Sequence, residues 1–116
     1  MATDNKSKNV SVDYPMEVKE AINEIGGLDR ILNAIRSDEI DAEAKLHRIL
    51  SDKTRLTILK GIRQCDLCPC VIKVLIKISD SRLSYHLMVL EEAGLITSYK
   101  KKNWKIYSIT EKGRSI

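Results

Sequence analysis

Large aromatic residues are scarce in this chain of 116 residues, which has no phenylalanine, one tryptophan and four tyrosines. A core in a domain of this size therefore has to be built from leucine, isoleucine and valine. Long apolar runs are absent as well, and the most apolar segment, VIKVLIKI, is interrupted by two lysines. A membrane-spanning helix needs about 20 apolar residues, so we expect no membrane partner.

The sequence also lacks a secretory signal and cysteines spaced along the chain as in a disulfide-stabilised domain. The first residues, MATDNKSKNV, are polar and lack the apolar segment of a signal peptide. The sequence has only three cysteines, and all of them lie in CDLCPC, from Cys65 to Cys70. We therefore expect a cytoplasmic protein, in which clustered thiols stay reduced and favour metal or redox chemistry.

Features of common enzyme sites are lacking too. The sequence has no glycine-rich phosphate loop and no nucleophile with a plausible base, and both histidines lie in helical contexts. We predict a protein that is not an enzyme and that uses no organic cofactor.

Charge is distributed unevenly along the chain. Residues 1–44 carry five Lys or Arg and ten Asp or Glu, whereas residues 45–116 carry fifteen and six. A strongly basic C-terminal part suggests contact with a polyanion, although a merely solvated basic face would have the same composition.

Hydrophobic periodicity suggests three regions. Residues 1–15 predict a disordered tail, and residues 16–44 predict an N-terminal helical extension. Within the extension, Met16–Arg36 carries apolar residues at alternating steps of three and four, interrupted by Gly26-Gly27, before a polar break at Ser37–Asp41. This stripe predicts a helix that docks on the domain or dimerises with a second copy.

Residues 45–116 have the pattern of a DNA-binding domain. One helix ends at Leu50, and a second runs from an N-cap at Ser51-Asp52 to Arg63. Pro69 suits the first turn of a helix over Cys70–Ile78, and Ser81–Ala93 is a further helix that Gly94 ends. LITSYK and KIYSIT alternate as two strands of a hairpin. The predicted fold is mainly α with a small β-hairpin, a winged helix-turn-helix with an N-terminal dimerisation helix.

The helix over Ser81–Ala93 is the predicted reading element. Its leucines at 83, 87 and 90 share one side and face the core, so Ser81, Arg82 and Tyr85 point outward with Ser84 and His86 at the flanks. Such a face suits the major groove, although an ordinary amphipathic surface helix has the same pattern. For His86, which leans toward the core, a structural role is the alternative to a base contact.

The hairpin is the predicted wing. Lysines at its tip repel one another unless phosphates neutralise them, and we expect Trp104 to pack at the wing base. The complete set of predicted DNA contacts is Ser79, Ser81, Arg82, Ser84, Tyr85, His86, Lys100, Lys101, Lys102 and Lys105.

Three segments together resemble the ArsR/SmtB family of metalloregulatory repressors. LHRILSDKTRLTILKGI is similar to the start of its winged domain, SDSRLSYHLMVLEEAGLI to its recognition helix and SYKKKNWKIYSIT to its wing. The resemblance covers about residues 45–110. It implies a dimeric winged helix that represses transcription on a near-palindromic operator until an inducer binds.

The same resemblance gives the cysteines a role. DLCPC is similar to the Cys-x-Cys pair of arsenic-type members, which implies that Cys68 and Cys70 bind a metal or metalloid. Cys65 is the candidate third ligand, because no cysteine follows the pair. Many members end with a dimerisation helix, and since this sequence stops soon after the wing, we expect Met16–Arg36 to replace it.

Three soft thiolates favour As(III), Sb(III), Cd(II) or Pb(II) over hard cations. Cys68 and Cys70 can meet on one ion only if the turn around Pro69 is not helical, and the helix dipole should favour the thiolate of Cys70. Two alternatives stay open: a thiol redox or persulfide sensor built on Cys65 and Cys68, and cysteines that are simply small apolar residues. In the predicted mechanism, ligand binding distorts the helix that supports the reading helix.

Overall fold

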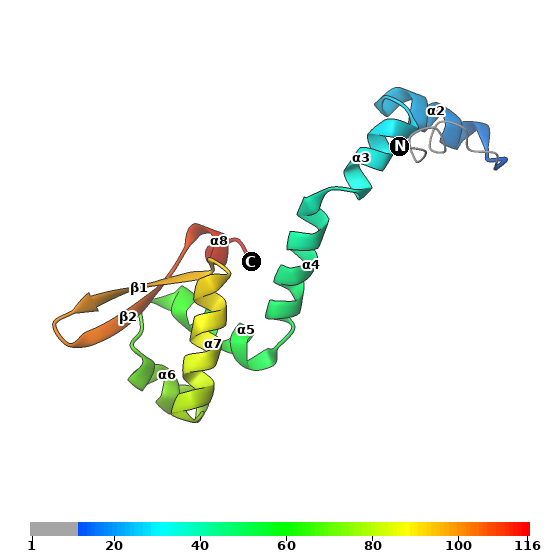
Figure 1. The fold of residues 1–116 in the computed structure, drawn as a ribbon. Coiled ribbons are helices and arrows are strands. Elements are labelled where there is room, and N and C mark those ends of the chain that lie inside the picture. The colour runs from blue at the N-terminus through cyan, green and yellow to red at the C-terminus, as the bar shows by residue number, and fades with distance from the viewer. Residues whose placement is uncertain (1–11) are drawn as a thin grey trace. The chain divides into compact units, whose positions relative to one another are not determined.

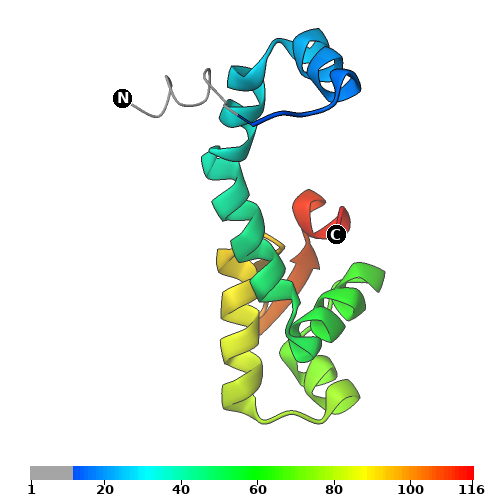
Figure 2. The same cartoon turned by 90° about the vertical axis from the view of Figure 1, so that its right-hand side faces the viewer.

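The computed structural model describes residues 12–116, so most of the predicted tail over residues 1–15 lies outside the described residues. The chain divides into two compact units between Glu43 and Ala44. Figures 1 and 2 show the elements of both units. Among the described helices, none is long and apolar enough to cross a membrane.

The first unit contains two short helices, α2 (Met16–Ile25) and α3 (Leu28–Ile35). They are separated by Gly26 and Gly27, whose φ angles of 113° and 94° lie in a region that residues with a Cβ rarely adopt. The predicted stripe over Met16–Arg36 is therefore carried by two helices. Neither helix buries a residue, and their apolar side chains stay exposed or half-exposed.

Helix α4 (Asp38–Leu50) begins earlier than the sequence suggested. Of the predicted polar break over Ser37–Asp41, only Ser37 lies outside a helix. Its hydroxyl accepts a hydrogen bond from the Glu39 backbone N–H at 2.9 Å, so it caps the start of α4. Acidic residues in the first turn, Asp38, Glu39 and Asp41, stabilise this helix start through the helix dipole.

The second unit holds α5 (Lys53–Gln64), α6 (Pro69–Ile76) and α7 (Asp80–Glu92). The N-cap of α5 is Asp52, whose Oδ1 accepts from the Arg55 N–H at 3.0 Å. Helix α6 ends two residues before its predicted end, because Lys77 adopts a left-handed φ of 53°. Helix α7 lies within one residue of its predicted bounds, and Gly94 follows it with a φ of 77°.

The core of this unit lies where the three helices meet the hairpin. It is made mainly of aliphatic residues, as the lack of phenylalanine required. Its buried hydrophobic members are Ile58, Leu59, Ile62, Ile72, Ile78, Leu83, Leu87, Leu90, Leu95, Ile96 and Tyr107.

The wing is an antiparallel hairpin of β1 (Ile96–Lys101) and β2 (Trp104–Ile109), and it projects from the helices of its unit in Figure 1. Its register runs from Ile96 opposite Ile109 to Lys101 opposite Trp104. A single bridge residue, Leu67, pairs with Tyr107 on β2. The order of elements in this unit is that of a winged helix-turn-helix, as predicted.

A last short helix, α8 (Glu111–Arg114), was not predicted. The Thr110 side chain accepts a hydrogen bond from the Gly113 N–H at 3.0 Å and donates one to the Gly94 carbonyl at 2.6 Å. Lys112 donates to the carbonyl of Ala93 at 2.8 Å. Helix α8 therefore closes over the end of α7 and the start of β1.

Candidate nucleic-acid interface and thiol segment

Helix α7 has one buried face and one exposed face. Ser79 caps it, its hydroxyl accepting from the Arg82 N–H at 3.3 Å. The predicted inward leucines are buried, and the exposed residues are Asp80, Ser81, Arg82, Ser84, Tyr85, Met88 and Glu92. Met88 was missed in the sequence, although it lies one helical turn after Ser84 and Tyr85 and shares their face. This face combines hydrogen-bond donors with an apolar side chain that can contact thymine methyl groups.

His86 is the exception among the predicted contacts on α7, because its side chain is only 5% exposed. Its Nδ1 lies 3.3 Å from the Arg55 guanidinium, which also donates to the Ile49 carbonyl at 2.8 Å. The same arginine's backbone N–H binds Asp52. His86 thus joins α7 to α5 and to the end of α4, which fits the structural role that its position in the sequence suggested.

Acidification is expected to destabilise this unit through His86. Burial lowers the pKa of His86 below 6.5, Asp52 opposes this effect, and Arg55 and Arg82 reinforce it. The unfolded chain then binds the proton more readily, so stability is complete above about pH 6.5 and falls as the pH drops toward the lower folded pKa. Thermal unfolding from neutral to mildly acidic pH should show a flatter dependence in His86→Gln than in the native chain. Equal slopes would contradict this role.

The lysines of the wing lie near its tip, as predicted. Lys100 pairs with Lys105 across the strands, Lys101 and Trp104 are the last pair, and residues 102 and 103 form the turn. Like charges directly opposite one another destabilise a hairpin, so phosphate contact would relieve a cost that the free wing carries. The prediction for Trp104 was wrong: its side chain is 58% exposed at the tip and does not pack at the base.

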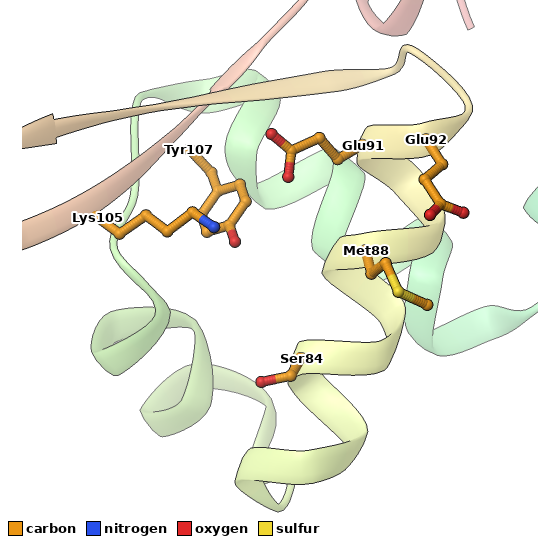
Figure 3. Close-up of a pocket in the computed structure, with 6 residues that line it drawn as sticks. All are labelled: Ser84, Met88, Glu91, Glu92, Lys105 and Tyr107. Atoms are coloured by element: carbon orange, nitrogen blue, oxygen red, sulfur yellow. The ribbon is translucent and has the colours of Figure 1, made fainter.

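A surface pocket of about 470 Å³ separates α7 from the wing. It is lined by Ser84, Met88, Glu91 and Glu92 of α7 and by Lys105 and Tyr107 of β2, and Figure 3 shows the side chains of Ser84 and Glu91 pointing toward the two residues of the wing. The Lys105 ammonium lies 5.3 Å from the centre of the Tyr107 ring. A hydrogen bond to Tyr107, helped by the charge of Glu91, raises the pKa of Lys105.

A second pocket, of about 330 Å³, lies beside the N-terminal end of α7 and is lined by positively charged side chains. Its polar lining consists of Lys53, Thr54 and Thr57 from α5, Lys77 after α6, and Arg82 from α7. Three cations and two hydroxyls around one hollow suit a phosphate group. Except for Arg82, the sequence did not single out these residues, because they come from three separate elements.

The thiols lie in the segment between α5 and α6. Cys65 follows the last residue of α5 with an extended backbone, and Cys68 is the N-cap of α6, also extended. That conformation lets the Cys68 and Cys70 side chains meet although Pro69 between them is already helical. The sequence required the turn around Pro69 to be non-helical. In the structure only Cys68 has an extended backbone there, and Pro69 and Cys70 belong to α6.

The two thiols differ in acidity, and the prediction that the thiolate of Cys70 is favoured was wrong. A hydrogen bond from Cys70, followed by the Val71 backbone N–H at the start of α6, lowers the pKa of Cys68. Donating that hydrogen bond raises the pKa of Cys70. At the start of α6 the thiolate is therefore favoured at the N-cap, Cys68, whereas at Cys70 the hydrogen bond to Cys68 outweighs the backbone N–H groups that lower its pKa.

The predicted three-thiol set is not assembled in this structure. Within residues 12–116 no group of three or more His, Cys, Asp or Glu side chains could hold a metal ion. All three cysteines are free, with Cys65 and Cys70 exposed and Cys68 half-buried. A site with three thiolates would require Cys65 to move toward the other two.

The fold and the basic reading surface define a winged helix-turn-helix regulator that binds DNA, and not an enzyme. The model of the ArsR family of bacterial regulatory proteins matches residues 52–98. A putative arsenical resistance operon repressor from Halobacterium salinarum is 30% identical over 102 residues, which cover 86% of this chain and 77% of that protein. This chain belongs to the ArsR family and is a transcriptional regulator of the ArsR repressor type.

Two further proteins resemble this chain. A cadmium resistance transcriptional regulatory protein from Listeria innocua is 35% identical over 75 residues, covering 57% of this chain and 63% of that protein. A homodimeric winged helix-turn-helix DNA-binding domain from Mycobacterium bovis has a TM-score of 0.61 at 20% identity, covering 67% of this chain and 72% of that one. The second likeness supports the fold.

Proposed function

We propose that the protein is a homodimeric repressor that binds a near-palindromic DNA duplex and leaves it when a thiophilic ion binds Cys65, Cys68 and Cys70. The observation that carries this proposal is the position of Cys68 and Cys70 on either side of Pro69 at the start of α6, with Cys68 as its extended N-cap, and the hydrogen bond between their thiols lowers the pKa of Cys68. Helix α6 precedes α7 in the helix-turn-helix. An ion bound there acts on the DNA-binding unit itself, in the cytoplasm.

The class of ligand follows from the donor atoms. Thiolates are soft ligands that favour As(III), Sb(III), Cd(II) or Pb(II) over hard cations. The lowered pKa of Cys68 supports this, because the thiolate is the form that binds. Two relatives point the same way, since one is named for arsenical resistance and the other for cadmium resistance.

The proposed DNA contacts fall into two kinds. The exposed face of α7 reads base edges, and the wing lysines and the basic pocket bind phosphates. In a dimer, two copies of α7 enter successive major grooves about one helical turn apart. The exposed apolar residues of α2 and α3, such as Val18, Ile25 and Ile35, are the proposed dimer contacts, and sedimentation analysis measures whether the dimer forms.

A thiol redox or persulfide sensor is the second candidate function. It is favoured by the acidity of Cys68 next to the exposed thiol of Cys70, because reactive sensor cysteines have a low pKa and are accessible. Both candidates use the same segment and the same output on DNA.

Fluorescence anisotropy of a labelled random duplex tests the function directly. Binding should weaken steeply with salt, since displaced counterions make phosphate contacts salt-dependent. Arsenite, cadmium chloride or a mild oxidant is then added to the complex, and the agent that lowers the anisotropy identifies the sensor class. Cys68→Ser should abolish the response and leave the affinity of the free protein for DNA within about twofold, because serine keeps the shape of the N-cap.

Cys65→Ser is the companion variant. It should weaken the response without abolishing it, because the hydrogen-bonded pair of Cys68 and Cys70 remains. Binding that does not depend on salt would contradict the DNA-binding role of this surface. A Cys68→Ser variant that responds like the native chain would contradict the proposed sensor site.

A further inference from the structure

The segment that carries the thiols is hydrogen-bonded to both strands of the wing. The Leu67 N–H donates to the Tyr107 carbonyl at 3.0 Å, and the Tyr107 N–H donates back to Leu67 at 2.9 Å. Next to this bridge, the Tyr99 hydroxyl donates to the Asp66 carboxylate at 2.8 Å. Tyr99 lies on β1 and Tyr107 on β2, so the segment contacts both strands of the hairpin.

These contacts lie between the cysteines that the proposed function brings together. Asp66 and Leu67 stand between Cys65 and Cys68 in the sequence, and Cys65 has to move to join the other two thiols. Where the backbone of Cys65 moves to bring its thiol to the other two, the peptide units of Asp66 and Leu67 shift with it, because the bonds that join them have fixed lengths. The hydrogen bond to Tyr99 and the bridge to Tyr107 are then strained or broken.

The wing also has a separate attachment to α7. The Ser98 hydroxyl donates to the Glu91 carboxylate at 2.8 Å. Ser98 and Tyr99 are neighbours on β1, yet one holds the hairpin to the reading helix and the other holds it to the thiol segment. Substituting Ser98 or Tyr99 therefore removes one hydrogen bond at a time, either the one from the wing to α7 or the one from the wing to the thiol segment.

We propose that Asp66 and Tyr99 are positioning residues that couple the thiol segment to the wing, so that ligand binding acts on DNA chiefly by displacing the lysine-bearing hairpin. This proposal rests on the proposed function and deepens it, because it names the element that moves. It differs from the sequence-based mechanism, in which only the helix supporting the reading helix is distorted. Trp104, at the wing tip and 58% exposed, is the single tryptophan of the chain and reports on the hairpin.

The test compares the native chain with Tyr99→Phe, which removes one hydroxyl, and with Ser98→Ala as the matched control. Cadmium binding is followed without DNA by the ultraviolet absorption of the thiolate–metal bond, and wing displacement by Trp104 fluorescence. Release from duplex DNA is measured in parallel by anisotropy. These three readouts separate ligand binding, wing movement and DNA release.

Tyr99→Phe should bind cadmium as tightly as the native chain but show a smaller change in Trp104 fluorescence. Its cadmium-induced loss of DNA affinity should be reduced by about fivefold, the lower range of measured allosteric couplings. Ser98→Ala should keep the native response in both readouts.

If Tyr99→Phe binds cadmium and responds like the native chain in fluorescence and DNA release, the coupling through Tyr99 is wrong while the proposed function stands. Equal loss of response in Ser98→Ala and Tyr99→Phe would also overturn it, because any weakening of the wing would then suffice. If neither cadmium nor arsenite binds the native thiols, the proposed function and this coupling fall together.

Discussion

Replacing Gly113 with alanine is expected to lower the free energy of unfolding by about 3 kcal/mol, the upper range for overpacking a core. A Cβ at Gly113 would overlap the carbonyl oxygen of Leu95 and lie 2.8 Å from Ile109 Cδ1. The backbone of Leu95 cannot yield easily, because Leu95 is fully buried. Helix α8 would have to lift away instead, losing the Thr110 hydrogen bonds that hold it.

Gly61→Ala is the matched control, and urea denaturation measures both variants. Gly61 lies within α5, where an added Cβ meets only Leu67 Cδ1 at an ordinary 3.7 Å. Alanine inside a helix is favoured over glycine by about 0.5–1 kcal/mol, so this variant should be as stable as the native chain or more stable. Equal midpoints for Gly113→Ala and the native chain would show that α8 does not pack tightly.

The second large effect concerns DNA. A triple variant with Lys53, Lys77 and Arg82 changed to Gln should bind duplex DNA about a hundredfold more weakly at low salt. It should also reduce the slope of log affinity against log salt by roughly 2 to 3, because each phosphate contact contributes about 0.9. These three cations line one pocket with two threonine hydroxyls, where a phosphate would displace their counterions.

A control with the same loss of charge distinguishes this site from general attraction. Lys19, Lys45 and Lys60 are exposed and do not line the pocket. Changing all three to Gln lowers the net charge equally, so their effect on affinity should be much smaller. The phosphate role of the pocket would be contradicted if both triple variants lost the same affinity, as measured by anisotropy across a salt series.

Local signals in the sequence were sufficient for the elements of the DNA-binding unit. The leucine spacing and Gly94 predicted α7 to within one residue, because these determinants lie inside the helix or beside it. Alternating residues around a lysine-rich turn likewise predicted the wing. The glycine pair marked the interruption of the N-terminal stripe, although the sequence did not tell a bend from two separate helices.

Features that depend on contacts between distant residues were missed or predicted wrongly. The basic pocket needs three elements to meet, and the place of Trp104 depends on the hairpin register. The prediction of a favoured thiolate at Cys70 was wrong, because the sequence did not reveal that Cys68 would be the N-cap of α6 and would be hydrogen-bonded to Cys70. Tyr99 and Asp66 are 33 positions apart, and no spacing rule predicts their hydrogen bond.

Two of the three hydrogen bonds between the thiol segment and the wing are made by main-chain atoms of Leu67 and Tyr107. Peptide groups persist through any exchange of side chains, so the donor atoms at positions 65, 68 and 70 can be altered without cutting that connection. Substitutions at these positions can thus change which inducer the protein binds and leave its connection to the wing unchanged. In this fold, the selectivity for the inducer and the coupling of inducer binding to the wing can evolve separately.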